Sequence, residues 1–404
     1  MAFSQAVSGL NAASANLDVI GNNIANAATY GFKSSTAAFA DIFAGSQVGL
    51  GVKMSGINQN FKDGTPTTTN RPLDLAITQS GFFRLQDSNG GIYYSRNGQF
   101  KMDENRNIIN MQGMKLTGYP AVSINGGVPQ VQKGANPVAI TVSQDMLLAK
   151  ATTEVTMQAN LNSMHKVPTE AFSPDKPDSY NYPNTITVFD SLGNPHGISV
   201  FFVKTNDNEW QVYARDGDVA GAKEASLGTL KFDGNGKVIG NDNQFTFNVP
   251  SLNGSLASDI TINFNNSRQQ KIDADSVTKP TQNGYAAGQF SGYRIENDGS
   301  VVGTYSNQQS QLLGQIVMTN FANPEGLSAQ GDNVWSETGA SGSPVVGTAN
   351  SGNFGKLLSN TLESSNVDMS QELVNMIVTQ RNYQSNAQTI KTQDQILQTL
   401  VSLR

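Results

Sequence analysis

Two histidines, His165 and His196, are the side chains from which catalysis or metal binding would first be expected in this chain of 404 residues. Both stand in or beside turns that contain proline. They lack the spacing of the H-E-x-x-H zinc helix, and the chain has no cysteine to complete a metal site. We therefore predict solvent-exposed turn histidines, no metal site and no cofactor.

Patterns for nucleophilic catalysis and calcium binding are equally weak. No G-x-S-x-G elbow occurs, and sequence order alone does not test for a Ser-His-Asp triad or for a carboxylate pair among the 32 acidic residues. The stretches 103–107 (DENRN) and 233–236 (DGNG) resemble calcium loops in composition only, because they miss the glycine and glutamate positions of an EF-hand. We interpret both as turns, and we predict that the protein is not an enzyme.

The chain carries little charge. Charged residues make up 14% of it, against about 25% in a typical soluble domain, and the net charge is -6. This leaves no basic surface for nucleic acid. The first basic residue is Lys33, and no apolar run is long enough to cross a bilayer. We expect no membrane insertion and no cleavable secretory signal.

The N-terminal residues 1–32 predict an amphipathic helix with a plausible stop at Gly31. Apolar residues recur every seventh position in two series, with alternating spacings of three and four, which is the pattern of a coiled-coil seam. The two series are Phe3, Leu10, Leu17 and Ile24, and Ala6, Ala13, Ile20 and Ala27.

The C-terminal residues 366–404 predict a second helix, with Ser365 and Asp368 as a capping start. Its seam consists of two sevenfold series, Met369, Met376, Tyr383, Ile390 and Leu397, and Leu373, Gln380, Ala387, Asp394 and Val401. A second apolar stripe lies near the two ends of the helix, at Val374, Ile377 and Val378 and at Ile396, Leu400 and Leu403. Either each terminal helix packs on the core of its own domain, or the two helices pair with each other and with helices of other copies. The second stripe favours pairing with helices of other copies, because a single partner helix would leave this stripe exposed to water.

The middle of the chain predicts β-structure. Alternating apolar runs at 81–86, 92–96, 184–190, 198–204 and 209–215 are typical of strands, and turn dipeptides separate them. The last three runs predict a meander, and we expect the runs at 228–232, 245–249 and 259–264 to continue it. Breaks near 145 and 286 predict an outer β domain, 145–286, inserted into a discontinuous inner β domain, 72–144 and 287–357. The remaining segments, 33–71 and 358–365, would connect this centre to the helices. The fold class is therefore α+β, with paired terminal helices and two largely all-β domains.

Several stretches resemble the bacterial flagellar rod and hook axial protein family. The match runs in order through 17–35 (LDVIGNNIANAATYGFKSS), 73–83, 93–120, 305–342 and 365–404, a little under half of the chain. The family signature falls on Asn22, Asn23, Ile24, Ala25, Asn26, Gly31, Phe32 and Lys33. The size of the central block resembles that of hook members rather than the shorter distal rod members.

This resemblance implies a structural subunit that self-assembles into a curved, flexible tube, which couples the rod to the filament and transmits torque. It implies a place outside the cell and partners that comprise copies of the chain itself, a distal rod protein, a hook cap protein, hook–filament junction proteins and the type III export apparatus. Two alternatives stay open, namely a distal rod component and a secreted β-rich adhesin that would bind through 145–286.

For self-assembly we expect the interface to consist of large apolar side chains of the two helices. These residues are Phe3, Leu10, Leu17, Ile20, Ile24, Leu373, Met376, Tyr383, Ile390, Leu397 and Val401.

The low charge of the helices predicts that assembly depends only weakly on salt. Up to Lys33 the N-terminal helix carries one charged side chain, Asp18. Raising the salt from about 50 mM to about 500 mM should therefore leave the amount of sedimentable polymer nearly unchanged, because few exposed charges are screened. A steep loss of polymer over this range would contradict the prediction.

Overall fold

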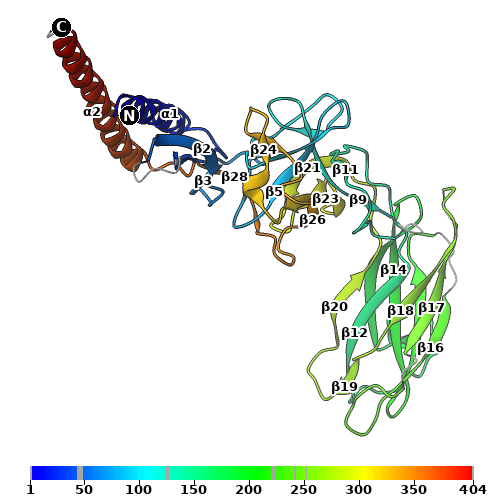
Figure 1. Cartoon of the computed structure of the whole chain (residues 1–404). Helices are drawn as coiled ribbons and strands as arrows, with labels where there is room; N and C mark the ends of the chain where they lie inside the picture. The colour runs from blue at the N-terminus through cyan, green and yellow to red at the C-terminus, as the bar shows by residue number, and fades with distance from the viewer. Residues whose placement is uncertain are drawn as a thin grey trace. The chain divides into compact units, whose positions relative to one another are not determined.

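The computed structural model describes residues 2–42, 49–123, 127–219, 224–240, 243–251 and 253–402. These divide into two compact units (Figure 1). The first unit comprises Met1–Ser143, Gly292–Thr304 and Ser310–Arg404, and the second comprises Gln144–Ser291 and Tyr305–Gln309. Within the described residues, no helix is long and apolar enough to cross a membrane.

The first terminal helix, α1, spans Ala2–Ala25 and confirms the helix predicted at this end. It ends before Gly31, so Ala27 of the predicted seam lies beyond it. The side-chain amide of Asn26 turns back and donates to the backbone oxygen of Asn22 at 3.0 Å. The backbone N–H of Asn26 still donates to the Asn22 oxygen at 3.1 Å, whereas that of Ala27 donates to the Ile24 oxygen at 3.3 Å, so the chain leaves the α-helical pattern in a tighter turn.

The second terminal helix, α2, spans Met369–Ser402 and is also confirmed. Its N-cap is Asp368 rather than Ser365. One carboxylate oxygen of Asp368 accepts the backbone N–H of Ser370 at 2.9 Å and of Gln371 at 3.1 Å, which satisfies two donors that the first turn leaves free.

Short antiparallel ladders connect the helices to the rest of the first unit. Strands β1 (Ser35–Ile42) and β2 (Gly51–Gln59) form a hairpin, and contacts join both strands to α1. Two further ladders pair the chain after β2 with the chain before α2. Their strands are β3 (Pro66–Thr68) with β28 (Thr361–Glu363), and β4 (Leu75–Ile77) with β27 (Leu357–Ser359).

The largest sheet has 13 strands among the described residues, with β21-β22-β23-β9-β5-β6-β25-β24 as its main path. Aromatic side chains dominate one of its buried clusters, where Phe82, Tyr94, Phe321 and Trp335 pack together with Leu327. The strands are β5 (Phe82–Gln86), β6 (Ile92–Ser95), β7 (Lys101–Met102), β8 (Ile108–Ile109), β9 (Lys115–Val122), β10 (Gln130–Val131), β11 (Val138–Ala139), β21 (Phe290–Ile295), β22 (Ser300–Tyr305), β23 (Ser310–Asn320), β24 (Ser328–Ala329), β25 (Val334–Ser336) and β26 (Val345–Thr348).

The second unit contains two sheets that share one core. The four-stranded sheet runs β13 (Tyr182–Phe189), β14 (Pro195–Asn206), β15 (Glu209–Asp216) and β16 (Ala225–Lys231). The five-stranded sheet consists of β12 (Glu154–Asn162), β17 (Gln244–Val249), β18 (Ser258–Asn263), β19 (Arg268–Gln270) and β20 (Ser276–Gln282). Every second residue of β12 and β15 is buried, and the buried residues of both sheets form a single cluster.

The predicted strands of this region are confirmed, but their grouping was wrong. We expected β17 and β18 to continue the β13–β16 meander, whereas they pair with β12 in the other sheet. The reason is burial, because a single meander would leave the inward face of every strand exposed, and a second sheet covers it.

The prediction of two exposed histidines was also wrong. His196 is fully buried in β14, with Nδ1 2.8 Å from Asp216 Oδ2 and Nε2 3.6 Å from Asp190 Oδ2. The strand begins at Pro195, so alternation points His196 into the core. The side chain of His165 is 31% exposed, and its Nε2 lies 2.5 Å from Asp275 Oδ2.

Asp190 makes the second unit sensitive to acid. Burial alone would raise its pKa, but hydrogen bonds from the side chain and backbone of Asn194 and from the Leu192 N–H lower the pKa to about 2. A carboxyl whose folded pKa lies below its ordinary value stabilises the fold above that value. This stabilisation is lost as the pH falls from the ordinary value of 3.8 towards about 2.

Asp190→Asn should therefore lower the free energy of unfolding at neutral pH by about 1–3 kcal/mol, because the new amide would face the donor amide of Asn194. Calorimetry of the full chain at several pH values measures the effect. The matched control is Asp233→Asn, in a similar turn that binds backbone N–H groups only, where we expect a change below about 0.5 kcal/mol. Equal melting of both variants at neutral pH would contradict the role given to Asp190.

Candidate self-assembly interface

A buried carboxylate, Glu363, holds together the base of the two terminal helices. Its Oε1 lies 2.6 Å from Lys33 Nζ and accepts the Gly64 N–H at 2.8 Å, while its Oε2 lies 3.2 Å from Arg96 Nη1. Arg96 also pairs with Asp63 at 3.2 Å. Two cations and two anions therefore balance, which is the condition under which buried charges persist.

Burial lowers the pKa of Lys33 in this cluster. Removal of the ammonium from water lowers the pKa of Lys33, the neighbouring Arg96 lowers it further, and Glu363 offsets part of the change. The Lys33 side chain also donates to the backbone oxygen of Lys62 at 2.7 Å. Lys33 is thus an anchoring residue rather than a free surface cation.

Gly31 lets the chain after α1 pass close to this cluster. Its φ is +70°, a left-handed value that favours glycine, and a Cβ at this position would lie 2.5 Å from the backbone nitrogen of Asn97. The Gly31 N–H donates to the backbone oxygen of Glu363 at 2.7 Å. Only glycine fits at this close approach to Asn97 without displacing the backbone.

Asn23 joins three elements at the end of α1. Its side-chain oxygen accepts the Ser35 N–H at 2.9 Å, and its amide donates to the Ser35 oxygen at 2.8 Å and to Glu372 Oε1 at 3.4 Å. One buried amide therefore fixes the start of β1 and the first turn of α2 relative to α1.

The contacts between α1 and α2 repeat every seven residues. Asn16 Nδ2 donates to Thr379 Oγ1 at 3.0 Å, one heptad from the Asn23–Glu372 bond. One heptad further, Gly9 lies so close to Asn386 that a Cβ would approach its amide to 2.8 Å. The positions run in opposite directions along the two helices, so the pair is antiparallel and in one register. Because α2 is longer, it extends past the start of α1 (Figure 1).

These specific contacts come from polar and small residues, while Ala6, Ala13 and Ile20 of the predicted seam are buried. In a single copy Ile20 is buried, Leu10, Leu17, Ile24, Met376 and Ile390 are half-buried, and the others of the predicted interface are exposed. The exposed fraction is 51% for Phe3, 55% for Leu397 and 76% for Val401. The exposed members are Phe3, Leu373, Tyr383, Leu397 and Val401. Of the second stripe, Leu403 and the side chain of Leu400 lie outside the described residues.

Sequence reasoning missed the small and polar contact residues, although Gly9, Asn16 and Asn23 themselves recur at a spacing of seven. It also missed the function of the family signature. In the structure, Asn26 donates to Asn22 at the end of α1, Asn23 binds Ser35, Gly31 permits the close approach to Asn97 and Lys33 binds Glu363.

Family models match four stretches of the chain. The model described as "Flagella basal body rod protein" covers residues 4–33, and "Flagellar hook protein FlgE/F/G D1 domain" covers 76–160. "Flagellar basal body protein FlaE D2 domain" covers 160–285, and "Flagellar basal body rod FlgEFG protein C-terminal" covers 358–403.

Full-length relatives decide between rod and hook. The flagellar hook protein FlgE of Salmonella typhimurium is 60% identical over 407 residues, which cover all of both chains. This chain belongs to the flagellar hook protein family. The hook protein of Escherichia coli is 59% identical over the full length of both chains, and that of Borreliella burgdorferi is 31% identical over 98% of each. As a hook protein, the chain is a structural subunit of the bacterial flagellum.

A solved structure agrees at the level of the fold. The Helicobacter pylori flagellar hook protein FlgE2 aligns with a TM-score of 0.54 at 13% identity, over 74% of this chain and all of that one. The agreement supports the α+β class, with terminal helices and largely β domains.

Replacing Glu363 with glutamine should destabilise the first unit. Glu363→Gln would leave Lys33 and Arg96 without their buried counter-charge, and we expect the free energy of unfolding to fall by about 3 kcal/mol. The matched control is Glu296→Gln, which breaks an exposed pair with Arg294 and should cost less than about 1 kcal/mol. Calorimetry of both variants measures this, and equal melting temperatures would refute the anchoring role.

Proposed function

We propose that the apolar side chains of α1 and α2 join copies of this hook protein into a tube. The observation that carries the proposal is the exposure of Phe3, Leu373, Tyr383, Leu397 and Val401 in a single copy. Each large apolar side chain contributes about 1.5–3 kcal/mol when fully buried, so a few per copy suffice along a polymer. Leu10, Leu17, Ile20, Ile24, Met376 and Ile390 complete the interface.

The proposal divides the chain by task. Residues 1–32 and 366–404 form the assembly domain, to which 33–71 and 358–365 connect the centre. The inner β domain comprises 72–144 and 287–357, and the inserted outer β domain comprises 145–286. Contacts between outer domains that are largely polar and uncharged would let subunits slide as the tube bends, so that torque passes round a curve.

The same proposal includes binding partners and a path of export from the cell. Besides its own copies, the chain would contact the distal rod protein, the hook cap protein and the hook–filament junction proteins. It would leave the cell through the type III export apparatus. It would act as a structural element without catalysis, cofactor, nucleic acid or membrane insertion.

A charge placed in the seam should block assembly without unfolding the β domains. In Leu17→Asp the carboxylate would lose its hydration wherever copies pack, so we expect electron microscopy to show no tubes while the melting of the second unit stays unchanged. The matched control is Leu256→Asp, which alters a leucine that is 74% exposed in the second unit and should leave tubes intact. Tubes of normal length from Leu17→Asp would contradict the assignment.

A further inference from the structure

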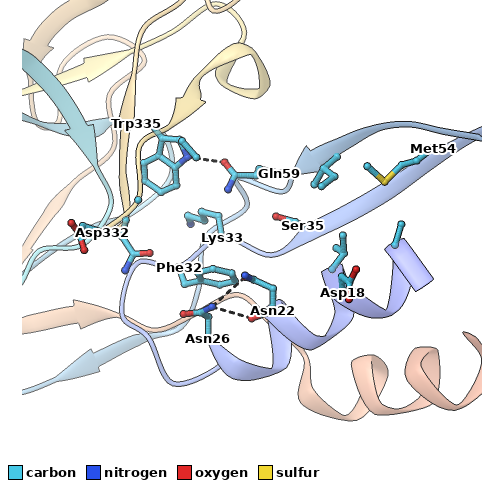
Figure 2. A pocket seen from close by; sticks show the side chains of 16 residues that line it. Asp18, Asn22, Asn26, Phe32, Lys33, Ser35, Met54, Gln59, Asp332 and Trp335 are labelled. Atoms are coloured by element: carbon cyan, nitrogen blue, oxygen red, sulfur yellow. Dashed lines mark hydrogen bonds between the residues drawn. The ribbon is translucent and has the colours of Figure 1, made fainter. Parts of the chain in front are cut away.

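An open groove lies beside α1 in the first unit, between the helix, the β1–β2 hairpin and the turn before β25 (Figure 2). Its volume is about 670 Å³. We call it the α1–β2 groove and define it by Asp18, Val19, Met54, Ile57, Asp332 and Trp335, which line it. The hydrogen bond from Trp335 Nε1 to Gln59 Oε1, at 2.7 Å, fixes the indole beside the hairpin.

The groove is apolar and carries unbalanced acids. Met54 and Ile57 are 43% and 52% exposed, so the groove presents apolar surface to water. Asp18 and Asp332 are exposed, and neither takes part in an ion pair among the described residues. Lys33 also lines the groove, but Glu363 neutralises it. The groove therefore suits an apolar ligand surface with a positive charge beside it.

The far face of α2 has this chemistry. Val374, Ile377 and Val378 are 51–54% exposed, and the exposed Arg381 follows at the helical spacing that keeps all four on one face. Thr379 points to α1, and Ile377, two residues earlier, lies on nearly the opposite side of the helix. Arg381 has no ion pair among the described residues either.

We propose that the far face of α2 of one copy docks into the α1–β2 groove of a second copy. Val374, Ile377 and Val378 would cover Met54 and Ile57, and Arg381 would meet Asp18 or Asp332. This inference rests on the proposed function, because it requires copies to associate through their terminal helices. Charge complementarity selects a second copy, since one chain carries both the acidic groove and the basic helix face.

The two surfaces differ, and this has a geometric consequence. Within one chain α2 is held on α1 by its opposite face, through Asn16–Thr379 and Asn23–Glu372, so its far face cannot fill its own groove. A contact between two different patches is head-to-tail. Such contacts extend into rings or open helical polymers, whereas a self-complementary patch closes a dimer.

Charge reversal and exchange test this docking in the full chain. Sedimentation of polymer, seeded with fragments of wild-type tubes, gives the critical concentration of each variant. Arg381→Glu should raise it about tenfold, because it places like charges together at every contact. Combining Arg381→Glu with Asp18→Arg or with Asp332→Arg should return it to within about threefold of wild type. Lys101→Glu, which reverses an exposed charge on β7, is the matched control and should not alter it.

The outcomes separate the docking from the proposed function. A critical concentration for Arg381→Glu equal to that of Lys101→Glu would overturn the docking, and so would failure of both exchanges to restore assembly. If Leu17→Asp still abolished tubes in either case, the terminal helices would remain the assembly domain. Thermal melting of each variant shows that the chain is folded before assembly is measured.

Discussion

The arrangement of the first unit depends on the requirement that the charge of Glu363 be satisfied away from water. A carboxylate that is 2% exposed needs counter-charges and N–H donors in fixed positions, and here Lys33, Arg96 and Gly64 supply them. These residues come from segments far apart in the sequence. Their convergence brings the chain that leaves α1 next to the chain that enters α2, so α1 ends where α2 begins.

From that point, polar contacts set the register of the helix pair. The Asn23–Glu372 and Asn16–Thr379 bonds and the close approach at Gly9 would all be lost together by a shift of one residue, because they share a single heptad spacing. Several large apolar side chains of the helices, among them Phe3, Leu397 and Val401, remain exposed. The register is thus fixed within the copy, and apolar area remains exposed where our proposal places the contacts between copies.

Much of the fold could be predicted from periodicity. The sevenfold series at both ends predicted α1 and α2, and the alternation around Trp210 predicted β15. Pairing across sheets could not be predicted, because the partner of β17 depends on which strand covers the core and not on the nearest strand in sequence. Periodicity also finds apolar positions only, which is why Asn16 and Asn23 were missed.

The sequence singled out some residues of the candidate site, but it did not predict what they do. Lys33 and Gly31 stood out as parts of a signature, but their functions depend on Glu363 and Asn97, which are remote in sequence. We predicted an exposed His196 because a proline precedes it. That proline is the first residue of β14, so His196 lies within the strand. In each case the missing information was a long-range partner.

The central claim is that one anchored helix pair presents two different surfaces, through which copies join head to tail. A cryo-electron microscopy reconstruction of the assembled tube at side-chain detail tests this most directly. The account predicts Ile377 of each copy within about 4.5 Å of Met54 or Ile57 of another copy, the distance of an apolar contact. A tube in which the α1–β2 groove is open to solvent, or in which the far face of α2 contacts a different surface, would contradict it.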